Sequence, residues 1–408
     1  MPQQRSYELN RRLSLPLVVF YGIGTILGAG IYVLVGKVAA YAGMYAVMSF
    51  LIASVLAAFT AFSYAELAHR FPRSAGEAVY IQQGFQRRYL STMVGLMIVL
   101  MGSVSSATML HGFVGYLKVF VDWPATPVMI GLLVLMLVIA IWGIAQSVWI
   151  ASVMTLAEIF GLLMILWVAG DSVTQLAERG GELIPPMDGM AWSGILLGAF
   201  VAFYAFIGFE DIVNVAEEVK QAESNLPRAI IISLLVTTLF YILIAMVSIL
   251  TIAPPQLAAS DAPLAMIYQQ ATGRPPTVIS LISLASVING ALIQVIMASR
   301  ILYGMGRQGW LPGRFGSVYG LTRTPLIATL AVGILILTFS LVLPLLSLAK
   351  LTSFITLTIF SLINLALWRI KRRTNEGVKF VVPLWVPICG FFCSTIFLLY
   401  QLGHFLAD

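Results

Sequence analysis

Long stretches without any Lys, Arg, Asp or Glu are the feature that most limits how this sequence can fold. Eleven such stretches follow one another, at residues 13–36, 38–65, 89–117, 123–157, 159–170, 189–209, 229–260, 275–299, 324–349, 351–368 and 380–407. A helix needs about 20 mostly apolar residues to cross the hydrocarbon core of a bilayer. These stretches are continuously apolar and do not alternate, which favours helices over the strands of a membrane β-barrel. The sequence therefore predicts an all-α polytopic membrane protein.

Composition supports this prediction and excludes several other classes. Hydrophobic residues make up 60% of the chain and charged residues only 10%, against about 25% charged residues in a soluble domain. A soluble globular protein, a disordered chain and a nucleic-acid binder are thereby excluded. The stretch at 123–157 is too long for one span and divides at a turn near residues 142–146. Its second part continues through Glu158 to residue 170 as one helix, so the predicted number of spans is eleven.

The distribution of Lys and Arg predicts the orientation in the membrane. Cytoplasmic loops of membrane proteins carry an excess of these residues, and with the N-terminus inside, 18 of the 23 Lys and Arg residues fall on the cytoplasmic side. Residues 1–14 are polar and contain no apolar core of a cleaved signal peptide. We therefore expect a multi-pass protein of the inner (cytoplasmic) membrane of the cell, with a cytoplasmic N-terminus.

Two spans contain residues that interrupt a helix. The first has five glycines between residues 22 and 36, and each glycine inside a helix costs about 0.5–1 kcal/mol relative to alanine. In the sixth, Gly208, Glu210 and Asp211 interrupt an apolar run. The two interrupted spans are five apart, and because five is odd, a second copy of a five-span unit would insert upside down. This spacing predicts the five-plus-five inverted repeat of secondary transporters, with repeats at about 13–170 and 189–373 and an extra span at about 380–407.

A break at Gly28–Gly30 would expose backbone groups that can bind a zwitterion. Free N–H groups at the start of the outer half-helix suit a carboxylate, and free carbonyl groups near Ile26 suit an ammonium group. The alternative is that the glycines only permit close helix packing. Beside the second break, Tyr204 and Phe206 are candidates for gates over a ligand, with an ordinary aromatic core as the alternative.

Three acids within the apolar stretches are candidates for coupling or gating. Intramembrane acids are costly and usually functional, although Glu210 and Asp211 could instead cap the half-helix that follows the second break. Glu158 has apolar neighbours in the sequence and could carry a coupling proton or help to bind a cation. The alternative is a structural hydrogen bond from protonated Glu158 to carbonyl groups of the first span.

Other polar residues favour structural roles. Glu66 and His69 lie near Arg70 and Arg73 at the inner end of the second span, where an ion pair is expected. His111 is expected to pack within the third span. Ser283, Ser286 and Asn289 are expected to form helix–helix hydrogen bonds, with an ion site as the alternative. Cys389 and Cys393 show no disulfide or zinc spacing and are expected to be inert thiols.

Five motifs in a consistent order resemble those of the amino acid–polyamine–organocation (APC) superfamily of permeases. Residues 22–32 (GIGTILGAGIY) are similar to its G-x-G-x-x-x-G-x-G-I-[FY] signature, and residues 203–210 (FYAFIGFE) to its F-x-A-F-x-G-F-[DE] motif. Residues 63–72, 216–230 and 299–312 resemble the end of span 2, the loop after span 6 and the end of span 8. The similarity extends from about residue 13 to residue 373.

The resemblance implies two inverted repeats with broken spans 1 and 6, and secondary active transport of amino acids by alternating access. It also implies that carbonyl groups near Phe203 and Phe206 bind the ammonium group of the substrate. The candidate binding residues are then Ile26, Gly28, Ala29, Gly30, Ile31, Phe203, Tyr204, Phe206, Ile207 and Gly208, and the candidate coupling or gating residues are Glu158, Glu210 and Asp211.

Departures from the family pattern concern the coupling ion and the partners. Many relatives carry a Lys where this sequence has Glu158, and we expect a proton to be the coupling ion, with sodium as the alternative. Relatives that pair with a glycoprotein subunit use a Cys between spans 3 and 4, which residues 118–126 lack. We therefore expect no disulfide-linked subunit; the expected partners are an amino acid, a proton and membrane lipid, without nucleic acid.

Other classes of function fit less well. No H-E-x-x-H, nucleophile elbow or P-loop motif is present, and His111 is the only deep histidine, so neither an enzyme nor a metal or other cofactor is expected. A channel would require a filter motif or a ring of charges. The predicted lining of Phe, Tyr, Ile and Ala favours neutral amino acids over cationic amino acids or polyamines. Exchange, uniport and a non-transporting amino-acid sensor remain alternatives.

Overall fold

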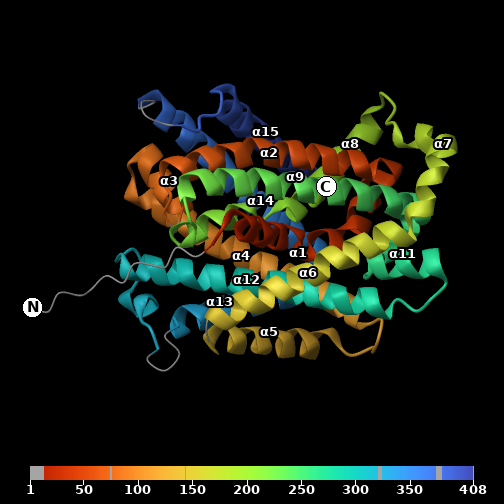
Figure 1. Cartoon of the computed structure of the whole chain (residues 1–408), viewed down its shortest axis with the longest axis horizontal. Helices are drawn as coiled ribbons and strands as arrows, with labels where there is room; N and C mark the ends of the chain where they lie inside the picture. The colour runs from red at the N-terminus through yellow and green to blue at the C-terminus, as the bar shows by residue number, and fades with distance from the viewer. Residues whose placement is uncertain (1–12, 74–75, 143, 320–323, 374–378, 408) are drawn as a thin grey trace, which may run out of the picture.

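The computed structural model describes residues 13–73, 76–142, 144–319, 324–373 and 379–407, and nearly all of this part is helical (Figure 1). The α-helices are α1 (Leu15–Ala42), α2 (Ala46–Arg70), α3 (Gly76–Phe85), α4 (Arg88–Leu117), α5 (Ala125–Trp142), α6 (Ile144–Val168), α7 (Leu176–Arg179), α8 (Gly189–Phe203), α9 (Ala222–Thr251), α10 (Pro254–Ala259), α11 (Pro263–Thr272), α12 (Thr277–Arg307), α13 (Leu326–Val342), α14 (Leu345–Arg373) and α15 (Trp385–Ala407). The short 3-10 helices are η1 (Gly43–Tyr45), η2 (Gly170–Gln175), η3 (Gly180–Leu183), η4 (Tyr204–Phe206), η5 (Phe209–Glu218) and η6 (Gly313–Gly316). One isolated parallel bridge, Leu13 to Val219, is the only strand-like pairing in these residues. The predicted all-α class is confirmed.

The long helices have the length and composition of membrane spans. Within the described residues, seven helical segments are long and apolar enough to cross a bilayer, and α6 with the bent segment after it can form an eighth. One of the seven, Leu15–Arg70, contains both α1 and α2, and α5 and α13 are shorter apolar helices. Eleven apolar helices therefore correspond to the eleven predicted spans of a multi-pass membrane protein. The inverted relation between the two halves stays a prediction.

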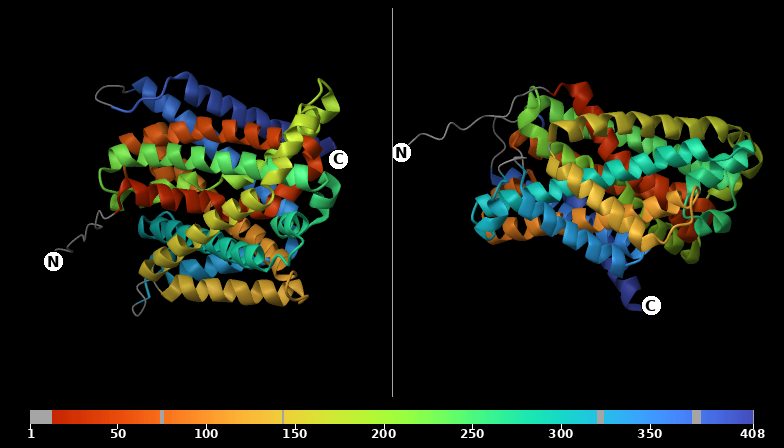
Figure 2. Two further views of the ribbon diagram at one scale, coloured as in Figure 1. Left: turned by 45° about the vertical axis from the view of Figure 1, so that its right-hand side comes forward. Right: turned by 90° about the horizontal axis from the view of Figure 1, so that it is seen from below.

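Helix α1 lies in the middle of the bundle. It packs against α8 and α9 on one side and against α6 and α12 on the other. Figure 1 shows α2, α9, α14 and α15 above α1, with α12, α13 and α5 below it, and the left view of Figure 2 shows the same order. The breaks in α1 and after α8 are consequently buried at the centre of the protein.

Both helix breaks predicted from the sequence are present. Within α1, only Gly28 has non-helical backbone angles (φ 17°, ψ −142°), so this break is narrower than the predicted segment Gly28–Gly30. The second break follows η4, where Ile207 is extended and Gly208 has a φ of 131°. A side chain rarely adopts that φ, so glycine is required there. The chain then continues as η5, a 3-10 helix that begins at Phe209.

Candidate functional site

A small cavity lies where the two helix breaks meet. Its lining consists of Thr25, Ile26, Gly28 and Gly30 from α1, Ser105 and Met109 from α4, Tyr204 and Ile207 from the second break, and Gln294 from α12. The free volume that a water-sized sphere can occupy is about 10 Å³, room for about one water molecule, so the cavity is nearly closed in this structure. None of these lining residues is Asp, Glu, Lys, Arg or His. The charged groups of a ligand bound here would therefore be met by backbone dipoles and not by charged side chains.

The glycines of α1 serve two different purposes. A Cβ added at Gly30 would lie 2.5 Å from the Cα of Ala205, and Cβ atoms at Gly22, Gly24 and Gly36 would also approach other atoms to 2.5 Å or less. A Cβ at Gly28 would have nothing nearer than Gly290 Cα, at 3.9 Å. Close packing thus explains four of the five glycines but not Gly28, where the backbone leaves the helix beside the cavity.

Tyr241 on α9 joins the two broken segments. Its hydroxyl lies 2.6 Å from the Ile26 carbonyl oxygen and 2.7 Å from the Ala205 carbonyl oxygen, both of which can accept its hydrogen bond. Thr25 makes a second link, because its hydroxyl lies 3.0 Å from the carbonyl oxygen of Gly208. Carbonyl groups released by the breaks are therefore partly satisfied by side chains, and each carbonyl oxygen retains a second lone pair for a ligand.

The predicted binding residues divide into lining and supporting groups. Ile26, Gly28, Gly30, Tyr204 and Ile207 line the cavity, whereas Ile31, Phe203, Phe206 and Gly208 do not. Phe206 packs edge-on against Tyr241 at 5.0 Å between ring centroids, and Phe203 packs against Phe360 at 5.8 Å. These two side chains are placed as aromatic core. The Ala29 side chain lies outside the described part of the structure.

Tyr204 connects the cavity to α4. Its hydroxyl lies 3.0 Å from the Ser105 hydroxyl and donates to the Ser105 carbonyl oxygen at 3.1 Å. The ring is buried within the cavity lining. A hydrogen-bonded aromatic ring in this position can cover one side of a ligand.

Glu158 is fully buried beside the first break. Its carboxyl group accepts a hydrogen bond from Asn289 Nδ2 at 2.9 Å, and its backbone carbonyl accepts one from the Tyr32 hydroxyl at 2.5 Å. One turn before Asn289, Ser286 donates to the Gly28 carbonyl oxygen at 2.8 Å. Two consecutive polar residues of one α12 face therefore contact Glu158 and the break in α1. In this structure the carboxyl group bonds to α12 and not to α1 carbonyl groups.

Glu158 is also incompletely satisfied. Its Oε2 atom and the Oδ1 atom of Asn289 are buried and have no hydrogen-bond partner among the described residues. An unpartnered buried oxygen is costly, and these two acceptors, on residues that already bond to each other, can be satisfied by a proton on the carboxyl group or by a bound cation.

Glu210 and Asp211 begin the segment after the second break. Glu210 Oε2 accepts the backbone N–H of Gly208 at 2.9 Å, and Gln294 Nε2 donates to Asp211 Oδ2 at 3.3 Å. The second oxygen of each acid is buried without a partner in the described part of the chain. Glu210 thus binds the backbone at the break, and Gln294 places Asp211 behind the cavity wall.

Glu77 on the short helix α3 is a third buried acid in this region. Burial, partly offset by a backbone hydrogen bond and assisted by the nearby negative charge of Glu210, raises the pKa of Glu77 to about 8. Glu77 is 2% exposed. Folding therefore favours the protonated form of this side chain near neutral pH.

His111 and Glu66 have structural partners. His111 bonds to the Ser340 carbonyl oxygen at 2.9 Å, as expected for packing. Glu66 pairs with Arg70 as predicted, and also with Lys371, which the sequence did not reveal. Cys389 and Cys393 are free thiols.

Several lining and capping residues could not be identified from the sequence. Ser105, Met109 and Gln294 reach the cavity, and Tyr241 caps both breaks. Gln294 offered a usable signal, because a polar amide in an apolar span is costly unless it has a partner. Ser105 is one of several small polar residues in its helix, and Met109 is apolar, so neither stood out.

Comparison with known proteins places the chain in a family. A family model described as amino acid permease matches residues 13–404. The branched-chain amino acid permease BcaP of Bacillus subtilis is 28% identical, over 97% of this chain and 89% of that protein. The vacuolar cationic amino acid transporter 4 of Arabidopsis thaliana is 27% identical over 91% of this chain, which spans only 65% of the plant protein.

Solved structures support the fold. A Na⁺-coupled sialic acid symporter in a substrate-bound, outward-open state has a TM-score of 0.65 to this chain, with 14% identity, covering 95% of this chain and 89% of the symporter. At that identity the likeness concerns the fold alone. Because the family model covers almost the whole sequence, the chain belongs to the amino acid permease family of the APC superfamily.

Proposed function

We propose that the protein is a secondary transporter that moves L-amino acids across the inner membrane of the cell by alternating access, with its N-terminus in the cytoplasm. The observation that carries the proposal is the cavity between two broken helices, lined by backbone at Gly28 and by no charged side chain. N–H groups after the break suit the substrate carboxylate, and carbonyl groups near Ile26 suit its ammonium group. The named relatives, an amino acid permease and an amino acid transporter, support the same substrate class.

Closing contacts on both sides of the cavity support alternating access. At one end, Lys37 on α1 and Lys118, directly after α4, both lie 3.8 Å from Asp261, in the connection between α10 and α11. At the other end, Leu13 before α1 pairs with the backbone around Val219 after η5. Each set joins segments that have to separate for the cavity to open on that side.

Neutral amino acids are the proposed substrates. Met109, Ile26 and Ile207 give the cavity apolar walls, and its polar side chains are uncharged. Cationic amino acids are the second candidate, because Gln294 links the cavity wall to the buried carboxyl group of Asp211. The relatives include both substrate classes by name.

A proton is the proposed coupling ion, carried by Glu158. Its unpartnered oxygen lies beside Asn289, and Ser286 connects the same face of α12 to Gly28 in the break. Gain or loss of a proton at Glu158 would therefore change a contact next to the ligand site. The alternative is a sodium ion bound by Glu158 and Asn289. If the Asn289–Glu158 bond is purely structural, Glu158 carries neither a proton nor sodium.

Transport into proteoliposomes tests the proposal. We expect saturable uptake of a labelled neutral amino acid, stimulated by an inward proton gradient. Before that, a thermal-shift screen of the twenty amino acids identifies ligands, because a ligand stabilises by RT ln(1 + [L]/Kd). Stabilisation by arginine or polyamines alone would overturn the neutral substrate, and ligand binding without uptake would indicate a sensor.

A further inference from the structure

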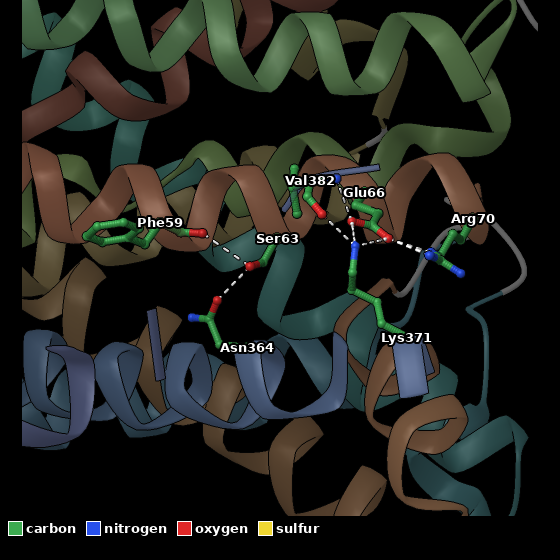
Figure 3. Close-up of polar contacts among 7 residues, drawn as sticks. All are labelled: Phe59, Ser63, Glu66, Arg70, Asn364, Lys371 and Val382. Carbon is green, nitrogen blue, oxygen red and sulfur yellow. Dashed lines mark hydrogen bonds and ion pairs between the residues drawn. The ribbon is translucent and has the colours of Figure 1, made fainter. Parts of the chain in front are cut away.

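Glu66 is the centre of a buried ion-pair network at the inner end of α2 (Figure 3). Lys371 Nζ, on α14, lies 3.1 Å and 2.8 Å from its two carboxyl oxygens, and Arg70 Nε lies 2.8 Å from one of them. The backbone N–H of Val382 donates to Glu66 at 2.8 Å, and Lys371 also donates to the Val382 carbonyl oxygen at 2.6 Å. The network thus joins α2, α14 and the connection from α14 to α15.

This network resists separation of the helices that it joins. The side chains of Glu66, Arg70 and Lys371 are at most 5% exposed. Removing one partner from such a buried pair leaves an uncompensated charge and is strongly destabilising. Pulling α14 away from α2 would expose the same groups without their partners, so the ion pair favours joint movement of both helices.

A second polar link lies two turns further along the same face of α14. Asn364 Oδ1 accepts a hydrogen bond from the Ser63 hydroxyl at 2.6 Å, and Asn364 Nδ2 donates to Thr60 Oγ1 at 2.9 Å (Figure 3 shows the Ser63 bond). Asn364 and Lys371 are seven residues apart, about 10 Å along a helix. Helix α14 is therefore held to α2 at two heights, which prevents sliding as well as separation.

The last turn of α2 holds the adjoining segments. His69 Nδ1 lies 2.6 Å from the Glu223 carbonyl oxygen at the start of α9, and its Nε2 accepts the backbone N–H of Lys379 at 3.2 Å. Both bonds are satisfied by neutral histidine with its proton on Nδ1. The beginning of α9 and the connection to α15 are thus fixed to the same end of α2.

The interface between α14 and α4 has a different character. The two helices pack extensively, but within the described residues no hydrogen bond or ion pair joins them. Apolar contacts are non-directional, so one helix can shift along the other without leaving polar groups unpaired. Polar contacts therefore hold α14 on the side toward α2, whereas no hydrogen bond or ion pair among the described residues holds it on the side toward α4.

From this contrast we propose that Glu66 is a positioning residue that makes α2, α14 and the connection to α15 move as one body during transport, while α14 slides across α4. The inference rests on the alternating access proposed above. The ligand site alone does not indicate which helices move together, whereas the Glu66 network does.

Reversible cross-linking tests the assignment. In a background with Cys389→Ser and Cys393→Ser, the pair Ser63→Cys and Asn364→Cys is bridged by Hg²⁺, a soft ion that binds thiolates, and released by excess thiol. We expect the bridged protein to keep at least about half of the uptake rate of its released form, a difference under 0.5 kcal/mol. Loss of uptake on bridging, restored by thiol, would overturn the proposal, as would absence of bridging.

A matched pair between α1 and α4, close to the Lys37 and Lys118 contacts that have to separate under the proposed alternating access, serves as the control. A Cβ at Gly112 on α4 would lie 3.5 Å from the Cβ of Val33 on α1, within the usual separation for a disulfide. Bridging Val33→Cys to Gly112→Cys should abolish uptake until thiol is added. If this bridge leaves uptake intact, alternating access fails and with it the proposed function, independently of the α2–α14 result.

Glu66→Gln provides a second readout. Because the network is remote from the cavity lining, we expect the maximal uptake rate to fall about tenfold with little change in KM. Bridging Ser63→Cys to Asn364→Cys in that variant should restore part of the rate, since the bridge replaces the lost connection. A lower rate that bridging does not improve, or a rise in KM of the same size, would contradict the positioning role.

Discussion

Asn289 on α12 donates a hydrogen bond of 2.9 Å to the carboxyl group of Glu158 on α6, and this contact lies one helical turn from the Ser286 bond to Gly28. The break in α1 and the buried acid are therefore connected through a single face of α12. Two oxygens at this contact, one on each residue, have no partner among the described residues. This arrangement leads to the first prediction.

Glu158→Gln should uncouple transport from the proton gradient. Glutamine keeps the size of the protonated acid and can still bond to Asn289, but it cannot release a proton. We expect exchange of labelled for unlabelled substrate to continue, while accumulation driven by a pH gradient is lost. Unchanged pH-driven accumulation would exclude Glu158 as the proton carrier, and uptake by the wild type driven by a sodium gradient alone would assign the site to sodium.

Gly30→Ala should destabilise the fold. The added Cβ would lie 2.5 Å from the backbone Cα of Ala205, so α1 and η4 would have to move apart. Overpacking of this kind costs about 1–3 kcal/mol, measured as a lower melting temperature in detergent.

Gly131→Ala is the matched control for Gly30→Ala. Gly131 lies within helix α5, and a Cβ there would meet nothing within 4 Å. Its melting temperature should be unchanged or slightly higher, because alanine is the better helix former. Equal losses of stability in both variants would show that the contact with Ala205 is unimportant.

Tyr241→Phe should weaken the hydrogen-bonded connection between the two broken helices. The ring would still pack against Phe206, but the buried carbonyl oxygens of Ile26 and Ala205 would both lose their hydroxyl partner. Leaving buried acceptors unsatisfied costs about 1–3 kcal/mol. We expect a lower melting temperature that substrate binding partly restores; the same change at exposed Tyr89 should have no effect.

Glu77 should make stability depend on pH. Its ordinary pKa of 4.5 is raised to about 8 by burial, so over this interval the folded protein holds a proton that the unfolded chain has released. The free energy of unfolding therefore falls as pH rises through the interval. The stabilisation is complete below pH 4.5 and lost above about pH 8.

Glu77→Gln tests this dependence, because glutamine does not titrate. Between pH 5 and pH 8, the wild type should lose on the order of 1–4 kcal/mol relative to the variant, seen in melting temperatures at several pH values. Glu182→Gln, in an exposed ion pair with Arg179, should retain the wild-type pH profile. Parallel profiles for wild type and Glu77→Gln would contradict the assignment.

Local features of the sequence were sufficient for the helices and their breaks. Each apolar stretch predicted a span because a bilayer demands a continuous apolar helix. Gly28 and Gly208 marked the breaks because glycine adopts backbone angles that other residues rarely do, although Gly22, Gly24, Gly30 and Gly36 stay helical. Glu158, Glu210 and Asp211 could be recognised as buried acids because they interrupt apolar stretches of the sequence.

The partners of these residues were decided only by the tertiary structure. The sequence did not connect Glu66 to Lys371, which is 305 residues away, or Tyr241 to the two carbonyl groups that it caps. It also could not separate Tyr204, which lines the cavity, from Phe206, which packs against Tyr241. Such contacts depend on how each helix is rotated and how it crosses its neighbours. In a chain that is apolar on nearly every helix face, the hydrophobic pattern carries little information about rotation, so packing and buried hydrogen bonds determine it.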